Sequence, residues 1–236
     1  YHNKKYILYI FFMKTLTITG KCDGFGAQYQ AIMSGIAYCN YMNYEYIHTP
    51  FVKIAHDGNI EELNQFIGIP SSKERNIDIV MKCCGDVHFS KTPDIYYNSH
   101  VLNKLRQYYD STVKPNIVGP TIALHIRRGD VKENNEKRYT RNNKYKEIIS
   151  LLLEKYPNDI ITIFSEGTID EFRDLQQDRI VFQLNDSIEE TFHSLVTAKV
   201  LVTAKSSFSY CAALLNKNEV YYMPFWHNPL KHWNIL

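Results

Sequence analysis

From residue 121 onward, short apolar runs alternate with longer amphipathic segments, and this alternation restricts the possible folds more than any other feature. Five apolar or β-branched runs are predicted to be strands: residues 121–126, 160–164, 180–182, 200–203 and 219–222. Four segments between them are predicted to be helices: residues 144–155, 169–175, 187–198 and 206–215. The third helix opens with a capping box, Asp186-Ser187-x-x-Glu190. Strands that alternate with helices predict an α/β fold with a doubly wound parallel sheet, whose ligands bind where the strands end.

The N-terminal half is less regular, but it begins in a similar way. Residues 16–19 are predicted to be a strand, Cys22-Asp23-Gly24-Phe25-Gly26 a glycine turn, and residues 27–41 a helix. Strand, glycine turn and helix open a nucleotide-binding half. Further on, we expect helices at residues 61–67 and 102–109 and a strand at residues 77–81.

Proline and glycine mark a boundary between two halves. Pro115 and Gly119-Pro120 interrupt the chain just before the regular part begins. We therefore expect an N-terminal half at residues 1–115 and a C-terminal half at residues 116–236. Residues 1–12 precede the first methionine, Met13, and are interpreted either as non-native or as an edge strand.

Charge and cysteine content exclude several classes of protein. Lys and Arg number 27 against 25 Asp and Glu, a net charge of +2, which argues against a nucleic-acid partner. The five cysteines are odd in number and lack a repeated spacing, which argues against a disulfide framework. Cys83-Cys84 and His88 are too few ligands for a zinc site, so no metal is expected. With no transmembrane segment or signal peptide evident, we expect a cytoplasmic protein or one peripheral to a membrane.

The densest cluster of chemically active side chains is His125-Ile126-Arg127-Arg128-Gly129-Asp130, directly after the first strand of the C-terminal half. Guanidinium groups bind phosphate oxygens in a bidentate way and stay charged at working pH. Strand alternation predicts that Arg127 faces the cleft with His125, while Arg128 turns back to pair with Asp130 or a helix carboxylate. Two alternative interpretations of these residues stay open: a solvated loop without a ligand, or an integrin-type Arg-Gly-Asp tripeptide.

Two further loops are predicted to lie at the same sheet edge. Residues 203–209 place Ser206 and Ser207 at a helix start, where backbone N–H groups and the helix dipole favour an anion. Glu166 follows another strand and either binds a ribose hydroxyl or guanine, or caps the next helix. Together the loops predict a nucleotide-diphosphate site. A Walker motif is absent, and Tyr29 breaks the dinucleotide fingerprint.

These motifs resemble those of the α1,2-, α1,6- and protein-O-fucosyltransferase superfamily. Residues 125–130 are similar to its first motif in the form found in the α1,2 branch, and bacterial or viral members fit best. Residues 163–166 look like the second motif and residues 206–213 like the third. The turn at residues 24–28 is similar to the glycine-rich N-terminal turn of these enzymes, although Ala27 replaces the more usual asparagine.

The resemblance implies a GT-B-like architecture, in which two nucleotide-fold halves face a cleft. It also implies inverting, metal-independent transfer of L-fucose from GDP-β-L-fucose to a glycan hydroxyl. Arg127 would stabilise the leaving GDP, and Asp130 joins it as an expected catalytic residue. The expected donor-binding set is Gly24, Gly26, His125, Arg127, Arg128, Glu166, Ser206, Ser207 and Phe208.

The acceptor side is less well defined. Its candidate residues are Asp23, Gln28, Glu133, Trp226 and His227. Asp23, Asp130 and Glu133 are the candidates for the base that takes the acceptor proton. Two other functions stay open: transfer from another nucleotide sugar, such as GDP-rhamnose or UDP-xylose, and glycan binding without catalysis.

Overall fold

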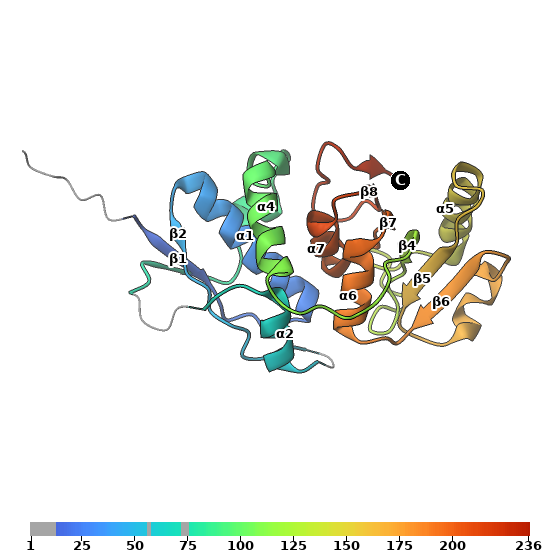
Figure 1. Ribbon diagram of the computed structural model, residues 1–236, viewed down its shortest axis with the longest axis horizontal. Coiled ribbons are helices and arrows are strands. Elements are labelled where there is room, and N and C mark those ends of the chain that lie inside the picture. The colour runs from blue at the N-terminus through green and yellow to red at the C-terminus, as the bar shows by residue number, and fades with distance from the viewer. Residues whose placement is uncertain (1–12, 56–57, 72–75) are drawn as a thin grey trace, which may run out of the picture.

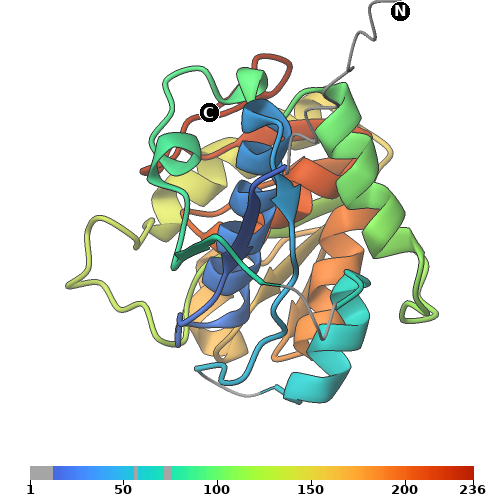
Figure 2. The ribbon, with the colours of Figure 1, turned by 90° about the vertical axis from the view of Figure 1, so that its left-hand side faces the viewer.

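The N-terminal half is built on a small parallel sheet. The computed structural model describes residues 13–55, 58–71 and 76–236, so the interpretation of residues 1–12 lies outside it. The elements of this half are β1 (Thr15–Ile18), α1 (Phe25–Met42), β2 (Glu45–Tyr46), α2 (Ile60–Ile67), β3 (Ile79–Met81), α3 (Gly85–His88), the 3-10 helix η1 (Pro93–Ile95) and α4 (Ser99–Asp110). The strands lie in the order β2-β1-β3. In Figure 2 these strands face the viewer and the long helices lie behind them.

The C-terminal half contains a six-stranded parallel sheet. Its elements are β4 (Ile122–His125), α5 (Asn142–Lys155), β5 (Ile161–Ser165), the 3-10 helix η2 (Ile169–Leu175), β6 (Ile180–Leu184), α6 (Ile188–Thr197), β7 (Val200–Val202), α7 (Ser207–Leu215), β8 (Glu219–Tyr222) and β9 (Asn234–Ile235). Helices cover both faces of this sheet, so the doubly wound α/β prediction is confirmed (Figure 1).

Alternating side chains of the central strands divide the core of this half. Ile122 and Leu124 of β4 join a core with Tyr145 of α5 and Phe172 of η2, whereas Ala123 joins a core on the opposite face. This is the period of two expected for a strand that is buried on both faces.

The second of these cores lies between the two halves. Figure 1 shows α6 and α7 beside α1, α2 and α4, with one sheet on each side. Phe192 of α6 is a T-shaped neighbour of Phe25 in α1, at 5.4 Å between ring centroids, and of Phe66 in α2, at 5.9 Å. One continuous apolar cluster therefore joins the halves.

Polar contacts reinforce this junction. Arg106 of α4 donates from Nε to the carbonyl oxygen of Leu215 at 3.0 Å and from Nη2 to that of Asn216 at 3.0 Å. These carbonyls lie at the C-terminal end of α7, where a helix lacks internal donors. An arginine of the N-terminal half thus caps a helix of the C-terminal half.

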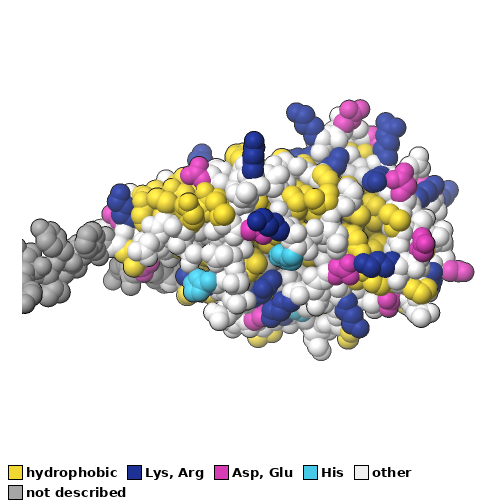
Figure 3. All heavy atoms as spheres, turned by 90° about the horizontal axis from the view of Figure 1, so that it is seen from above, with side chains coloured by type: hydrophobic (Ala, Val, Ile, Leu, Met, Phe, Trp, Pro, Cys, Tyr) yellow, Lys and Arg dark blue, Asp and Glu magenta, His cyan; other side chains and the backbone are white. Residues whose placement is uncertain are grey.

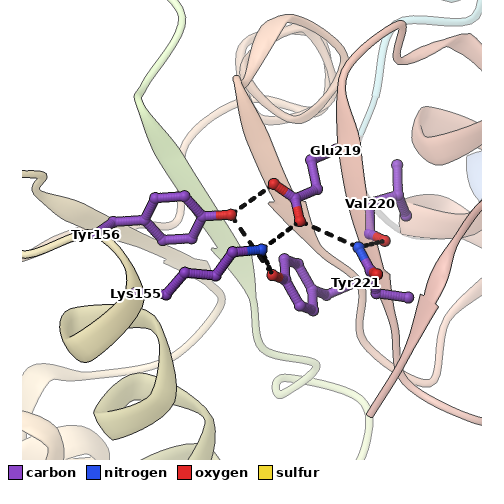
Figure 4. A network of polar contacts seen from close by, with 6 residues as sticks. Lys155, Tyr156, Glu219, Val220 and Tyr221 are labelled. Atoms are coloured by element: carbon purple, nitrogen blue, oxygen red, sulfur yellow. Dashed lines mark hydrogen bonds and ion pairs between the residues drawn. The ribbon is translucent and has the colours of Figure 1, made fainter.

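A second polar network fastens α5 to the sheet. Lys155 at the end of α5 donates to Glu219 Oε1 at 2.7 Å, and Tyr156 donates to the other carboxylate oxygen at 2.5 Å (Figure 4). Asn234 of β9 also donates to Glu219, at 3.2 Å. Glu219 therefore links α5, β8 and β9.

Charge is distributed unevenly over one face of the molecule. Figure 3 shows apolar patches over both halves of this face, whereas lysine, arginine and acidic side chains are more frequent toward the C-terminal half. Within the described residues, no helix combines the length and apolar character needed to cross a bilayer.

One predicted helix differs in kind. Residues 169–175 form the 3-10 helix η2 rather than an α-helix. The segment has seven residues, and Thr168 and Glu171 form a capping box across its first turn. This is long for a 3-10 helix, since most such runs stop after three or four residues.

Candidate active site

The order of the large sheet, β6-β5-β4-β7-β8-β9, locates the ligand edge. From β4 the chain first builds outward through β5 and β6, then returns to β7 on the other side of β4 and continues outward. Ligands of such sheets bind outside the carboxyl ends of the two strands where the direction reverses, here β4 and β7. The arginine motif follows β4 and the serine loop follows β7.

A cavity of about 340 Å³ opens at this point, between the two halves. Twelve of the fifteen residues proposed from the sequence line it: Asp23, Gly24, Gly26, His125, Arg127, Arg128, Asp130, Glu166, Ser206, Ser207, Phe208 and Trp226. Their roles stay predictions, but the structure brings them together around one space.

Two helices begin at this cavity, one from each half. Gly24 is the N-cap of the 18-residue helix α1, and Ser206 is the N-cap of the nine-residue helix α7. A Cβ atom on Gly26 would lie 2.5 Å from the backbone nitrogen of Phe208, so only glycine permits this approach. The positive ends of two helix dipoles therefore converge on one cavity, an arrangement that favours an anion.

Arg127 lies at the cavity with its guanidinium held by acidic groups. Its Nη2 lies 2.5 Å from Asp130 Oδ1, and its Nη1 lies 3.9 Å from Glu166 Oε1. The side chain keeps about a quarter of its surface exposed, at 24%. Arg127 is thus oriented yet reachable by a ligand.

Arg128 also lines the cavity, but its guanidinium is directed to backbone carbonyls and to α5, and its partners differ from the expected ones. It is 3% exposed and donates to the carbonyl oxygens of Arg127 and Thr140, at 2.9 and 3.0 Å, and to Asn142 Oδ1. Its guanidinium carbon lies 4.1 Å from the centre of the Tyr139 ring. The predicted pairing of Arg128 with Asp130 is wrong, because Arg127 holds that carboxylate.

His125 lies beneath the cavity as a neutral imidazole. It is 5% exposed and its ring lies 5.6 Å from the Phe208 ring. Burial, and then the charge of Arg127, lower its pKa to about 3. Its Nδ1 has no hydrogen-bond partner among the described residues, so one buried polar atom remains for a ligand or water.

The loop that follows β5 places a carboxylate beside the arginine motif. Gly129 has φ +74°, and a Cβ atom there would collide with the Glu166 carboxylate. Thr168 and Glu171 cap η2, so the alternative that Glu166 caps this helix is wrong. Glu166 instead lies at the cavity, 56% exposed.

The serine loop is shaped by its own hydroxyl groups. Ser206 Oγ accepts from the backbone N–H of Phe208 at 3.2 Å, which confirms that it caps α7. Ser209 Oγ accepts from the N–H of Ala204 at 3.0 Å and fixes the turn from inside. Lys205, which directly precedes Ser206, lines the cavity and adds a positive charge.

Three proposed residues lie elsewhere. Gln28 is buried and donates to the carbonyl oxygens of Asp23 and Lys53, at 2.6 and 2.7 Å, so it supports the glycine turn from behind. Glu133 is exposed and is not among the lining residues. His227 is 3% exposed beneath Trp226, with Nδ1 2.7 Å from the Tyr222 hydroxyl. These three residues therefore lie outside the lining of this cavity, and the acceptor-side roles expected for them stay predictions.

Sequence reasoning missed several lining residues. Asn185, Asp186 and Thr191 follow β6 and reach the cavity, as does Arg138 from the loop after the arginine motif. The left-handed Asn185, at φ 60°, bonds through its side chain to Gly167 and joins the loops after β5 and β6. Asn185 and Asp186 could have been found, because they are polar residues shortly after a predicted strand. No feature of the sequence around Arg138 indicates that it reaches the cavity.

Metal-binding potential is limited. Across residues 13–55, 58–71 and 76–236, no group of three or more His, Cys, Asp or Glu side chains is arranged to hold a metal ion. The positive groups at the cavity come from Arg127, Arg128, Arg138, Lys205 and the two helix ends.

Neither a protein-family model nor a curated protein matches this sequence. Among solved structures, the Escherichia coli heptosyltransferase WaaC with ADP-2-deoxy-2-fluoro heptose is 11% identical, with a TM-score of 0.48 over 95% of this chain and 93% of that chain. A mutant of Arabidopsis thaliana FUT1 in complex with GDP is 11% identical, with a TM-score of 0.47 over 94% and 72%. TarM is 13% identical, with a TM-score of 0.35 over 52% and 26%. At these scores the likenesses do not establish an activity for this chain.

Proposed function

We propose that this chain is an inverting glycosyltransferase that moves L-fucose from GDP-β-L-fucose to a hydroxyl group of a glycan. The observation that carries the proposal is the convergence of Arg127 and the starts of α1 and α7 on one cavity between the halves. A diphosphate is the anion that such a set of donors suits. The fucose assignment rests on the resemblance of residues 125–130 to the fucosyltransferase motif.

The leaving diphosphate gains negative charge as its bond to the sugar breaks. Donors already aimed at that charge stabilise the transition state without reorganising. Arg127 is assigned this role, with Lys205 and the N–H groups at the start of α7 beside it. Asp130 holds the guanidinium through an ion pair, so we assign it to orienting Arg127 rather than to proton transfer.

The acceptor hydroxyl must lose its proton as it attacks the anomeric carbon. Asp23 lines the cavity, and its carboxylate is 57% exposed and 3.1 Å from the Lys21 amine. We assign Asp23 as the base. In the step, the acceptor oxygen bonds to the anomeric carbon, the bond from that carbon to the diphosphate oxygen breaks, and the proton passes to the Asp23 carboxylate.

Thermal melts with GDP, UDP and ADP test the nucleotide assignment. GDP at 100 times its dissociation constant should stabilise the fold by about 2.7 kcal/mol, and the other two by less at equal concentration. Arg127→Ala should reduce the GDP effect, because it removes a diphosphate contact. An equal or larger shift with UDP would overturn the guanine assignment.

Transfer assays test the chemistry. We expect release of GDP from GDP-fucose, little turnover of GDP-rhamnose or UDP-xylose, and a large loss of rate in Asp23→Asn with donor binding retained. Activity should survive excess EDTA, because Arg127 takes the place of a divalent ion at the diphosphate. A loss of activity that manganese or magnesium restores would contradict this mechanism.

A further inference from the structure

Two exposed aromatic side chains meet at the rim of the cavity. Trp226 lines the cavity and is 38% exposed, and Phe89 beside it is 69% exposed. Their ring centroids are 5.7 Å apart, with the planes tilted by 50°. Contiguous apolar surface of this kind commonly marks a binding site.

The two rings belong to different halves of the chain. Phe89 directly follows α3, beyond the carboxyl end of β3, and Trp226 follows the carboxyl end of β8. Asn228 donates from Nδ2 to the carbonyl oxygen of Ser90 at 2.8 Å, which fastens the two segments next to the rings. The pair is therefore a fixed part of the junction between the halves.

Trp226 is also held by its other neighbours. The rings of His88, His227 and Phe225 have centroids 5.6, 4.7 and 5.9 Å from it. Both histidines are buried, and burial lowers their pKa to about 4 for His88 and about 3 for His227, so their rings are neutral. An indole packed in this way loses little conformational freedom when a ligand binds.

We propose that Phe89 and Trp226 form an acceptor subsite on which the apolar face of a pyranose ring packs. The inference rests on the proposed transferase function. A sugar ring has a face of C–H groups and a rim of hydroxyls. The C–H groups complement the negative face of an aromatic ring, and the hydroxyls stay available to polar groups. Asp23, the assigned base, lines the same cavity as Trp226.

A nucleobase also stacks on aromatic rings, but the position of Phe89 favours the acceptor. Phe89 belongs to the N-terminal half, whereas the nucleotide is assigned to the crevice outside β4 and β7. The two occupants predict different behaviour of Phe89→Ala. A sugar subsite loses affinity for glycosides and keeps affinity for GDP, while a base subsite loses affinity for GDP.

Tryptophan fluorescence provides the test without transferase turnover. The chain has two tryptophans, and Trp233 is 5% exposed, so Trp226 dominates any response to a ligand. Methyl glycosides of galactose, glucose, mannose and N-acetylglucosamine are titrated into the full chain. We expect a saturable blue shift with at least one glycoside, absent in Trp226→Phe. Phe89→Ala should weaken that binding by about two- to tenfold, the range of one aromatic contact.

Tyr41→Ala is the matched control. Tyr41 is an aromatic residue of the same half and is 54% exposed, but its ring packs at a tilt against Tyr96, at 4.8 Å, rather than against Trp226. Its removal should leave glycoside affinity unchanged. No shift with any glycoside up to its solubility limit overturns the subsite, as does equal weakening in Phe89→Ala and Tyr41→Ala. Loss of GDP stabilisation in Phe89→Ala also overturns it.

The outcomes separate this inference from the proposed function. Glycoside binding that Phe89→Ala weakens, in a protein that GDP does not stabilise, would support the subsite and contradict the transferase. Stabilisation by GDP without a fluorescence response to any glycoside would support the transferase and contradict the subsite.

Discussion

At the scale of single residues, two adjacent arginines have opposite surroundings. Both line the cavity, but Arg127 keeps 24% of its side chain exposed, whereas Arg128 is 3% exposed, donates to two backbone carbonyls and packs over Tyr139. Arg127→Ala should therefore lower turnover by about 100- to 1,000-fold, the cost of one preorganised donor. Arg127→Lys should recover only part of that rate, because a point charge does not reproduce the planar fork.

Arg128→Ala should act on stability instead. The substitution leaves the carbonyl oxygens of Arg127 and Thr140 buried without their donor, at a cost of about 1–3 kcal/mol. Turnover and melting temperature measured for all three variants compare the two arginines directly. A normal rate in Arg127→Ala together with an inactive, fully stable Arg128→Ala would reverse the assignment.

At the scale of elements, the contact between α1 and α7 depends on one missing side chain. A Cβ atom on Gly26 would lie 2.6 Å from the Cα atom of Phe208, and neither backbone has room to move inside the core. Gly26→Ala should therefore destabilise the fold by about 1–3 kcal/mol, as overpacking does, and lower its melting temperature by several degrees. Gly85→Ala is the control, since a Cβ atom there meets nothing within 4 Å. Equal melting temperatures for the two variants would show that the helices adjust freely.

The elements also show what the sequence could and could not predict. The strands and helices of the C-terminal half followed from apolar periodicity, because a sheet buried on both faces leaves continuous apolar runs. Their order then brought the loops after β4 and β7 together by topology alone. The strand β2 has only two residues and β9 follows a long irregular segment, so neither has a periodic pattern to detect.

The site residues could be predicted where they follow strands that the sequence shows, but not where they lie in irregular segments. Residues that directly follow long strands, such as Arg127 and Glu166, were placed correctly at the cavity. Trp226 lines the cavity while its neighbour His227 is buried, an alternation that an irregular segment does not reveal. Phe89 was missed because nothing local in the sequence shows that it meets a residue 137 positions later.

At the scale of the whole molecule, one apolar cluster joins the halves. Each half buries helices against the other, so this shared cluster is complete only when both halves are folded. We therefore expect a single calorimetric unfolding transition whose calorimetric and van't Hoff enthalpies agree. Two separate transitions, or independent folding of residues 116–236, would contradict this expectation.

Stability of the whole molecule should also fall in acid. Burial lowers the pKa of His48 and His88 to about 4, and of His125 and His227 to about 3, although the charge of Arg127 adds to the effect at His125. The unfolded chain takes up protons at these histidines near pH 6.5, while the folded chain does not. The free energy of unfolding therefore decreases as pH falls from about 6.5 toward 3–4, by up to about 1.4 kcal/mol per pH unit for each histidine.

Urea denaturation across this pH range measures the effect. His88→Gln should flatten the slope, because it removes one of the protonated groups from the unfolded chain. A slope that is unchanged in His88→Gln would show that His88 does not contribute to the acid response.

The direct contact between Gly26 and Phe208 has a consequence for how ligands enter and leave the cavity. The backbones of α1 and α7 are in direct contact here, and closely packed elements do not separate easily. We therefore expect the distance between the two halves, across the cavity, to stay constant rather than to change by a hinge motion. Under the proposed function, entry of the donor and release of the nucleotide would depend on the loops around the rim, among them the exposed segment at residues 132–138. We would then expect the residence time of the product to depend on how often such loops move aside, rather than on opening of the two halves.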